Sequence, residues 1–165
     1  MESLSKTLLQ LAEAYVEELK ANLGDDLVSV VLFGSVARGE ATPFSDIDLF
    51  IVVNDLPSGR VARLERLRAA ERRIEQRLKD LHAIRIYSDV CPILKTPEEA
   101  SRVRPLYLDF VEDAILLYDR KGFFADVLGR LKKRLRELGS VRRRMGKIRY
   151  WELKPDLRPG EVFEL

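Results

Sequence analysis

The chain has 165 residues, of which 46% are hydrophobic and 34% are charged, and its formal net charge is +2. The hydrophobic content excludes a disordered chain, the length suits one domain with its own core, and the charge is too small to indicate nucleic acid by itself. The single cysteine excludes an internal disulfide. No stretch has the pattern of a secretory signal or the length of a membrane span, so we expect a cytoplasmic protein without a membrane segment.

The choice of polar residues also indicates a source. The high charge content occurs together with only two Asn, two Gln, one Cys and two Met. Ion-pair networks combined with few labile side chains are typical of thermophiles, so we expect a thermophilic source.

The first half of the chain predicts two strands between long helices. Apolar residues recur at helical spacing over residues 3–22, and Gly24 ends this helix. Apolar runs predict strands over 27–34 and 47–53. A further periodic stretch predicts a long helix over 61–81 with a solvated charged face.

The second half predicts two more strands and several helices. A third strand is expected over 83–94, and Pro92 places it at an edge, at a bulge or at an early end of the ladder. Thr96 followed by Pro97 is typical of a helix start. The remaining elements are a helix over 106–111, a strand over 114–118, a helix over about 122–138 and an ordered tail over about 142–165. We expect an α/β (α+β) fold in a single domain, residues 1–165, with a mixed sheet of four to five strands flanked by helices.

A phosphate-binding turn follows the first strand. Gly34 marks a tight turn or a close approach to a ligand, and Ser35 and Arg38 follow it. Backbone N–H groups, a hydroxyl and a guanidinium together suit the oxygens of a triphosphate. Arg38 also has a simpler interpretation as a surface ion pair with Glu40.

A pair of carboxylates follows Ser35 after a gap of ten residues. Asp46 and Asp48 begin the second apolar run, and the period of a strand points both carboxylates to one face. Two hard oxygen ligands suit Mg²⁺, because waters and substrate phosphates complete its coordination shell. Ser45 either caps the turn before Asp46 or touches a phosphate.

Other reactive side chains have ordinary interpretations. His82 is expected at a helix end, where a contact with the helix dipole explains it. Cys91 is more typical of a small core residue than of a reactive thiol. The chain lacks the ligands for a zinc site.

These residues resemble the signature of the nucleotidyltransferase superfamily that includes DNA polymerase beta. That signature is a hydrophobic residue, Gly, Gly or Ser, a gap, and then Asp-hydrophobic-Asp. Here it is met by Phe33, Gly34, Ser35, Asp46, Ile47 and Asp48. The string GSVARGEATPFSDIDLFIV is similar to the small "minimal" nucleotidyltransferases of bacteria and archaea, including those paired with HEPN-type toxins. The resemblance rests on residues 30–54.

The resemblance implies an Mg²⁺-dependent transfer of a nucleoside monophosphate, with AMP from ATP expected, to a hydroxyl of a protein, a small molecule or an RNA end. Two metal ions are expected, with Asp46 and Asp48 as shared ligands. A third carboxylate on a neighbouring strand is also implied, and Asp89 is the candidate, although a turn or strand-edge role explains it almost as well. Glu98 and Glu99 are the fallback candidates.

The C-terminal part of the chain is strongly basic. Residues 130–149 hold ten Lys or Arg residues and one acid. The cluster Arg142, Arg143, Arg144 with Lys147 and Arg149 predicts a nearby anion, which is an RNA, a triphosphate or an acidic partner. The resemblance to nucleotidyltransferases paired with HEPN-type toxins also implies an alternative function, an antitoxin-like protein that binds and neutralises a HEPN-type partner, with enzymatic turnover secondary or absent.

Overall fold

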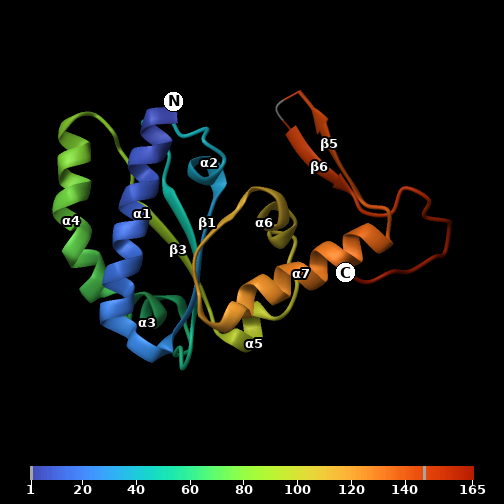
Figure 1. Ribbon diagram of the computed structural model, residues 1–165, viewed down its shortest axis with the longest axis horizontal. Helices are drawn as coiled ribbons and strands as arrows, with labels where there is room; N and C mark the ends of the chain where they lie inside the picture. Colours follow the sequence, from blue (N-terminus) through green and yellow to red (C-terminus); the bar gives the residue numbers. More distant parts are fainter. Residues whose placement is uncertain (1, 147) are drawn as a thin grey trace.

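In the computed structural model, which describes residues 2–146 and 148–165, four strands form a mixed sheet (Figure 1). The strands are β1 (Leu27–Phe33), β2 (Ile47–Val53), β3 (Val90–Lys95) and β4 (Ile115–Asp119), in the spatial order β3-β2-β1-β4. Strand β1 is antiparallel to β2 and β4, whereas β2 is parallel to β3. The predicted α/β class and mixed sheet are confirmed.

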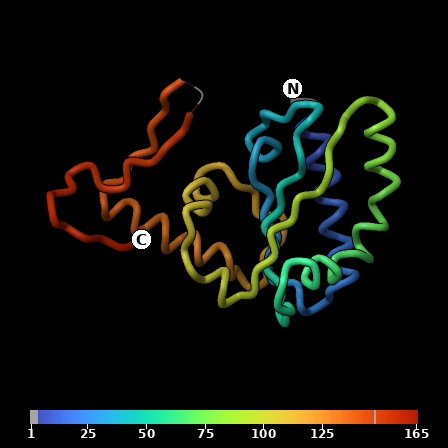
Figure 2. The backbone as a smooth tube through the Cα atoms, turned by 180° about the vertical axis from the view of Figure 1, so that it is seen from behind, coloured from blue at the N-terminus to red at the C-terminus, as the bar shows by residue number. Residues whose placement is uncertain are grey.

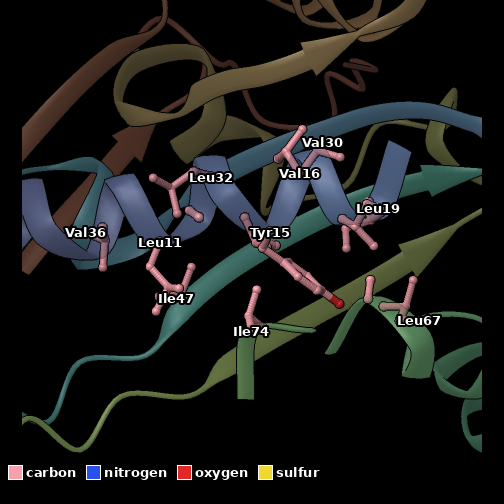
Figure 3. Close-up of a cluster of buried hydrophobic side chains, with 14 of the residues drawn as sticks. Leu11, Tyr15, Val16, Leu19, Val30, Leu32, Val36, Ile47, Leu67 and Ile74 are labelled. Atoms are coloured by element: carbon pink, nitrogen blue, oxygen red, sulfur yellow. The ribbon is translucent and has the colours of Figure 1, made fainter. Parts of the chain in front are cut away.

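One face of the sheet is covered by two long helices, α1 (Glu2–Leu23) and α4 (Arg68–Ala83). The alternating residues Ile47, Leu49 and Ile51 of β2 point into this layer and are fully buried. Figure 3 shows the Tyr15 ring of α1 extending across the layer. This burial explains the long apolar stripe of the N-terminal helix.

The predicted single helix over 61–81 is wrong, because the structure divides it into α3 (Arg60–Glu65) and α4. The break lies at Arg66 and Leu67. The Arg66 side chain leaves the helix to bond Asp26 and the carbonyl of Asp55, while Leu67 is buried in the core. Tertiary contacts therefore outweigh helix propensity at this point.

The opposite face of the sheet carries an aromatic core. It is covered by α5 (Pro97–Ala100), α6 (Tyr107–Asp113) and α7 (Phe123–Glu137). Phe50 of β2 contacts the rings of Tyr107, Phe110 and Phe124 at centroid distances of 5.1–5.5 Å. Both faces of the sheet are thus covered, which explains the nearly continuous apolar runs of its central strands.

The predicted strand over 83–94 is only partly correct, because β3 begins at Val90. The segment before it is a loop in which Arg85 has a φ of 63° and the Tyr87 N–H donates to the Pro43 carbonyl over 2.7 Å. Strand β3 lies at the edge of the sheet, as Pro92 predicts.

Three short helical turns complete the main body. They are η1 (Gly24–Asp26), α2 (Gly34–Ala37) and η2 (Arg120–Gly122). Within the described residues, no helix has both the length and the apolar character needed to cross a membrane.

The C-terminal segment contains a β-hairpin that its sequence does not predict. Strands β5 (Val141–Met145) and β6 (Ile148–Glu152) pair antiparallel and project beyond α7 (Figure 2). Lys147, one of the predicted basic cluster, lies outside the described residues. The last residues run back to α7, where Arg134 Nε donates to the Glu164 carbonyl over 2.9 Å.

Candidate active site

Gly34 is required at the end of β1 by a carboxylate that lies against it. It has a φ of +75°, and a Cβ atom added to it would lie 2.3 Å from Asp48 Oδ2. Strand pairing sets this contact, because Phe33 of β1 is in register with Asp48 of β2. The predicted phosphate-binding turn and the predicted metal ligand therefore meet at one place.

Asp46 lies one residue before β2, beside the start of β3. The Asp89 N–H donates to Asp46 Oδ1 over 3.1 Å, and the Cys91 thiol lies 3.8 Å from Asp46 Oδ2. Ile47, between the two aspartates, is buried on the opposite side, so strand alternation directs both carboxylates away from the α1 layer.

The electrostatic potential around Asp46 and Asp48 is negative. Partial burial raises the pKa of Asp48, and the nearby charge of Asp46 raises it further, whereas Arg38 opposes the shift. The pKa of the Cys91 thiol is raised by burial and by the charges of Asp46, Asp48 and Asp89. Unbalanced carboxylates of this kind attract a cation.

Asp89 lies next to this pair but its side chain has a different neighbour. Its carbonyl accepts from Ile47 N over 2.8 Å, while its exposed carboxylate lies 4.0 Å from His82 Nε2. His82 also contacts the Ser88 carbonyl at 3.3 Å. Among the described residues, no three His, Cys, Asp or Glu side chains are close enough to hold a metal by themselves.

The fallback acids do not join the site. Glu99 accepts two bonds from Arg63, at 2.7 and 2.9 Å, and completes a capping box with Thr96. Glu98 lies in the same first turn of α5. Helix α5 follows the end of β3, whereas Asp89 precedes its start, about 20 Å away along the strand.

Two polar side chains predicted to bind phosphate, Arg38 and Ser45, already have hydrogen-bond partners in the chain. Arg38 Nε donates to Glu40 Oε2 over 2.9 Å, as the surface-pair interpretation predicts. Ser45 Oγ accepts from Thr42 N over 2.9 Å, so Ser45 does stabilise the turn before Asp46. Ser35 is half-buried in α2.

An ion-pair network beside this turn is not apparent in the sequence. Glu40 pairs with Arg149 as well as Arg38, and Asp113 pairs with Arg142 and Arg149. A cavity of about 440 Å³ lies among these groups and is lined by Ala37, Arg38, Glu40, Glu112, Asp113, Arg142 and Arg149. The one signal in the sequence is the basic cluster, for which an RNA, a triphosphate or an acidic partner was expected, whereas the structure pairs Arg142 and Arg149 with carboxylates of the chain itself.

Comparison with curated proteins shows relatives in Methanocaldococcus jannaschii. The chain is 31% identical over 141 residues to "Putative protein adenylyltransferase MJ1305", covering 82% of this chain and 88% of the relative. It is 33% identical over 51 residues to "Putative protein adenylyltransferase MJ0141", covering 31% of this chain and 52% of that protein.

Among solved structures, one match is the tri-AMPylated Shewanella oneidensis HEPN toxin in complex with MNT antitoxin. The match has 17% identity and a TM-score of 0.40, and it covers 84% of this chain and 93% of that chain. Similarity this low establishes neither a shared activity nor a shared partner. The model of the nucleotidyltransferase domain, in contrast, matches residues 12–137, which include the whole turn and both aspartates. Together with the 31% identical relative, this match shows that the chain belongs to the nucleotidyltransferase domain family.

Proposed function

We propose that this chain is a metal-dependent adenylyltransferase that transfers AMP from ATP to a hydroxyl group of a protein and releases pyrophosphate. The observation that carries the proposal is the contact of Asp48 with Gly34, which brings a carboxylate pair to the phosphate-binding turn. The names of the two relatives support AMP as the transferred group and a protein as the acceptor.

The residues present fit Mg²⁺ better than they fit a metal ion whose ligands all come from protein side chains. Asp46 and Asp48 supply hard oxygen ligands, and partial burial together with the charge of Asp46 raises the pKa of Asp48. The lack of a third converging ligand among the described residues leaves positions for phosphate oxygens and water, as Mg²⁺ prefers. Bound Mg²⁺, with two ions expected, would neutralise the triphosphate and the leaving pyrophosphate.

The roles of the protein groups follow from this arrangement. Gly34, Ser35 and Arg38 orient the phosphates, and Asp46 and Asp48 hold the metal. The acceptor oxygen forms a bond to the α-phosphorus while the bond to the bridging oxygen of the pyrophosphate breaks. We assign the acceptor proton to Asp89, because its exposed carboxylate follows an N–H that donates to Asp46, and a turn of the side chain away from His82 would bring it toward the pair.

The test is to incubate the purified chain with ATP labelled at the α-phosphate, Mg²⁺ and soluble proteins of the source organism. We expect labelled protein and an equal amount of pyrophosphate, both abolished by EDTA, by Asp46→Asn and by Asp48→Asn. Asp89→Asn is expected to lower the rate by about 10²-fold or more without weakening ATP binding. The proposal is refuted if the intact, folded chain transfers no label, whether or not it binds ATP.

A second candidate is the antitoxin-like role, in which the chain binds and silences a HEPN-type partner without turnover. The observation that favours it is the position of the Asp89 carboxylate, which lies beside His82 and not with the other two. Neutralisation of such a partner by the Asp46→Asn and Asp48→Asn variants would identify this role. Loss of neutralisation together with transfer would identify the partner as the acceptor.

RNA binding through Arg142, Arg143 and Arg144 stays a prediction. Arg142 pairs with Asp113, and Arg143 pairs with Glu152 over 2.6 Å. A salt titration with RNA checks it, since RNA held by free cations dissociates steeply as salt rises.

A further inference from the structure

Strand alternation divides the β5–β6 hairpin into two faces of different chemistry. Residues paired across an antiparallel ladder share a face. The inner face carries Arg142, Arg144, Arg149 and Trp151. The outer face carries Val141, Arg143, Met145, Ile148, Tyr150 and Glu152.

The inner face attaches the hairpin to the phosphate-binding turn. Arg142 Nη1 donates to Asp113 Oδ1 of α6 over 2.9 Å, and Arg149 pairs with Glu40. Trp151 packs against the aromatic core. Because Glu40 also holds Arg38, the hairpin is positioned directly beside the group expected to bind phosphate.

The outer face is apolar and has no covering element in the described part of the chain. Val141, Met145, Ile148 and Tyr150 are exposed by 40%, 66%, 61% and 46%. The charges on this face, Arg143 and Glu152, neutralise each other. Exposed apolar side chains gathered on one face of a sheet mark an interaction surface.

We propose that this outer face docks the protein acceptor of the AMP transfer, so the inference rests on the proposed function. A face that is apolar and electrically neutral matches a protein surface of the same character. It does not match a nucleic acid, whose binding requires unpaired cations. The inner-face anchors hold the hairpin beside the predicted phosphate-binding turn, so a protein docked on the outer face is separated from the nucleotide by one strand layer, about 10 Å.

The size of the face favours a transient partner over a second copy of the chain. Two five-residue strands span only about 17 Å by 10 Å. A face of this extent is smaller than the roughly 800 Å² of accessible surface that each partner of a stable dimer buries. A contact this small suits an enzyme that must release each modified acceptor, with the rest of the recognition made at the site itself.

The test uses the double variant Met145→Lys/Ile148→Lys in the full-length chain. Both side chains are exposed, so the fold is expected to survive, as circular dichroism and thermal unfolding check. Val61→Lys is the matched control, because Val61 is 75% exposed and its helix, α3, lies far from the hairpin (Figure 1). Each protein is given α-labelled ATP, Mg²⁺ and RNase-treated soluble extract of the source organism, and ATP affinity is measured separately by calorimetry.

We expect the double variant to bind ATP as the wild type does but to label protein at least 10-fold more slowly, while Val61→Lys labels normally. The labelled protein is identified by mass spectrometry and purified. With it, the variant should show a raised KM for the acceptor and an unchanged kcat. Equal labelling by variant and wild type would overturn the docking inference and leave the proposed function intact.

Two other results would also overturn the inference. Label incorporated into RNA in untreated extract, and into no protein, would identify a nucleic acid as the acceptor. Sedimentation velocity that shows a wild-type dimer and a monomeric double variant would assign the face to a second copy of the chain. If the wild type labels nothing although it binds ATP, the proposed function fails, and the docking inference fails with it.

Discussion

At the scale of single residues, the site depends on how closely a carboxylate approaches a backbone turn. Asp48 occupies the space that any side chain at position 34 would need. The glycine signal in the sequence therefore reflects two constraints, a positive φ and a steric one. Gly39 has a similar φ of +71°, but no atom of the described residues lies within 4 Å of the place that a Cβ would occupy there, so the two constraints can be separated.

We expect Gly34→Ala to destabilise the protein by about 2–4 kcal/mol in urea unfolding. Adopting a left-handed conformation costs an alanine about 1–2 kcal/mol, and the overlap with Asp48 adds to this. Gly39→Ala should show only the first cost and keep its affinity for Mg²⁺ and ATP. Equal effects of the two substitutions would show that Asp48 does not press against position 34.

Asp48→Asn is expected to stabilise the fold while it abolishes AMP transfer. Because the pKa of Asp48 is raised in the folded state, protonation favours folding, and this contribution is lost as pH rises through the folded pKa. The variant avoids the cost of the half-buried charge, so thermal unfolding at pH 7 should show a gain of about 0.5–1 kcal/mol, reduced by solvent access. Wild type and variant should converge as the pH falls below that pKa, and a difference that persists there would refute this cause.

At the scale of secondary structure, the sequence predicted elements whose signals are local. The strand over 47–53 matches β2, and the Thr96 cap is present with its full capping box. The start of β3 was misplaced because the segment 83–89 is also apolar in part, and its loop depends on the contact of Tyr87 with Pro43. The sequence does not predict the hairpin, because three consecutive arginines hide the alternation of β5.

The residues of the site also divide into those with a local sequence signal and those that only the tertiary structure brings together. Gly34, Ser35, Asp46 and Asp48 lie within fifteen residues, so their spacing along two strands indicates their meeting. The pair Arg149–Glu40 joins residues 109 positions apart. No local pattern reveals such a pair, because its geometry depends on how α6, α7 and the hairpin pack.

The capping box of α5 should make stability depend on pH in acid. Arg63 lowers the pKa of Glu99 to about 2, and the bond to the Thr96 N–H lowers it as well. Because folding lowers the pKa of Glu99, its ionised carboxylate stabilises the fold fully at pH values above the unfolded pKa near 4.5. This stabilisation is lost as the pH falls toward 2. We expect Glu99→Gln to cost about 1 kcal/mol at pH 7 in urea unfolding and much less at pH 2–3. An equal loss at both values would contradict this, and Glu98→Gln, which lacks the Arg63 pair, is the control.

At the scale of the whole molecule, ion pairs connect the hairpin to the body that contains the nucleotidyltransferase sheet. The family match ends at residue 137, before the hairpin begins. The hairpin is nevertheless tied to α6 by Asp113 and to the predicted phosphate-binding turn by Glu40. Movement of Arg38 toward a bound triphosphate would therefore alter the charge balance at Glu40 and reach the hairpin.

Asp113→Asn tests this connection, because Asp113 anchors both strands of the hairpin through Arg142 and Arg149. Loss of that carboxylate leaves two arginines partly unpaired, so amide hydrogen exchange over 141–152 should accelerate by about 10-fold while β1 and β2 stay protected. Asp109→Asn is the control, since Asp109 lies 4.0 Å from Arg142 and should matter little. Unchanged exchange in the hairpin would mean that the packing of Trp151 holds it in place without the ion pairs.

Saturating ATP with Mg²⁺ should also change hairpin exchange in the wild type, because the nucleotide competes with Glu40 for Arg38.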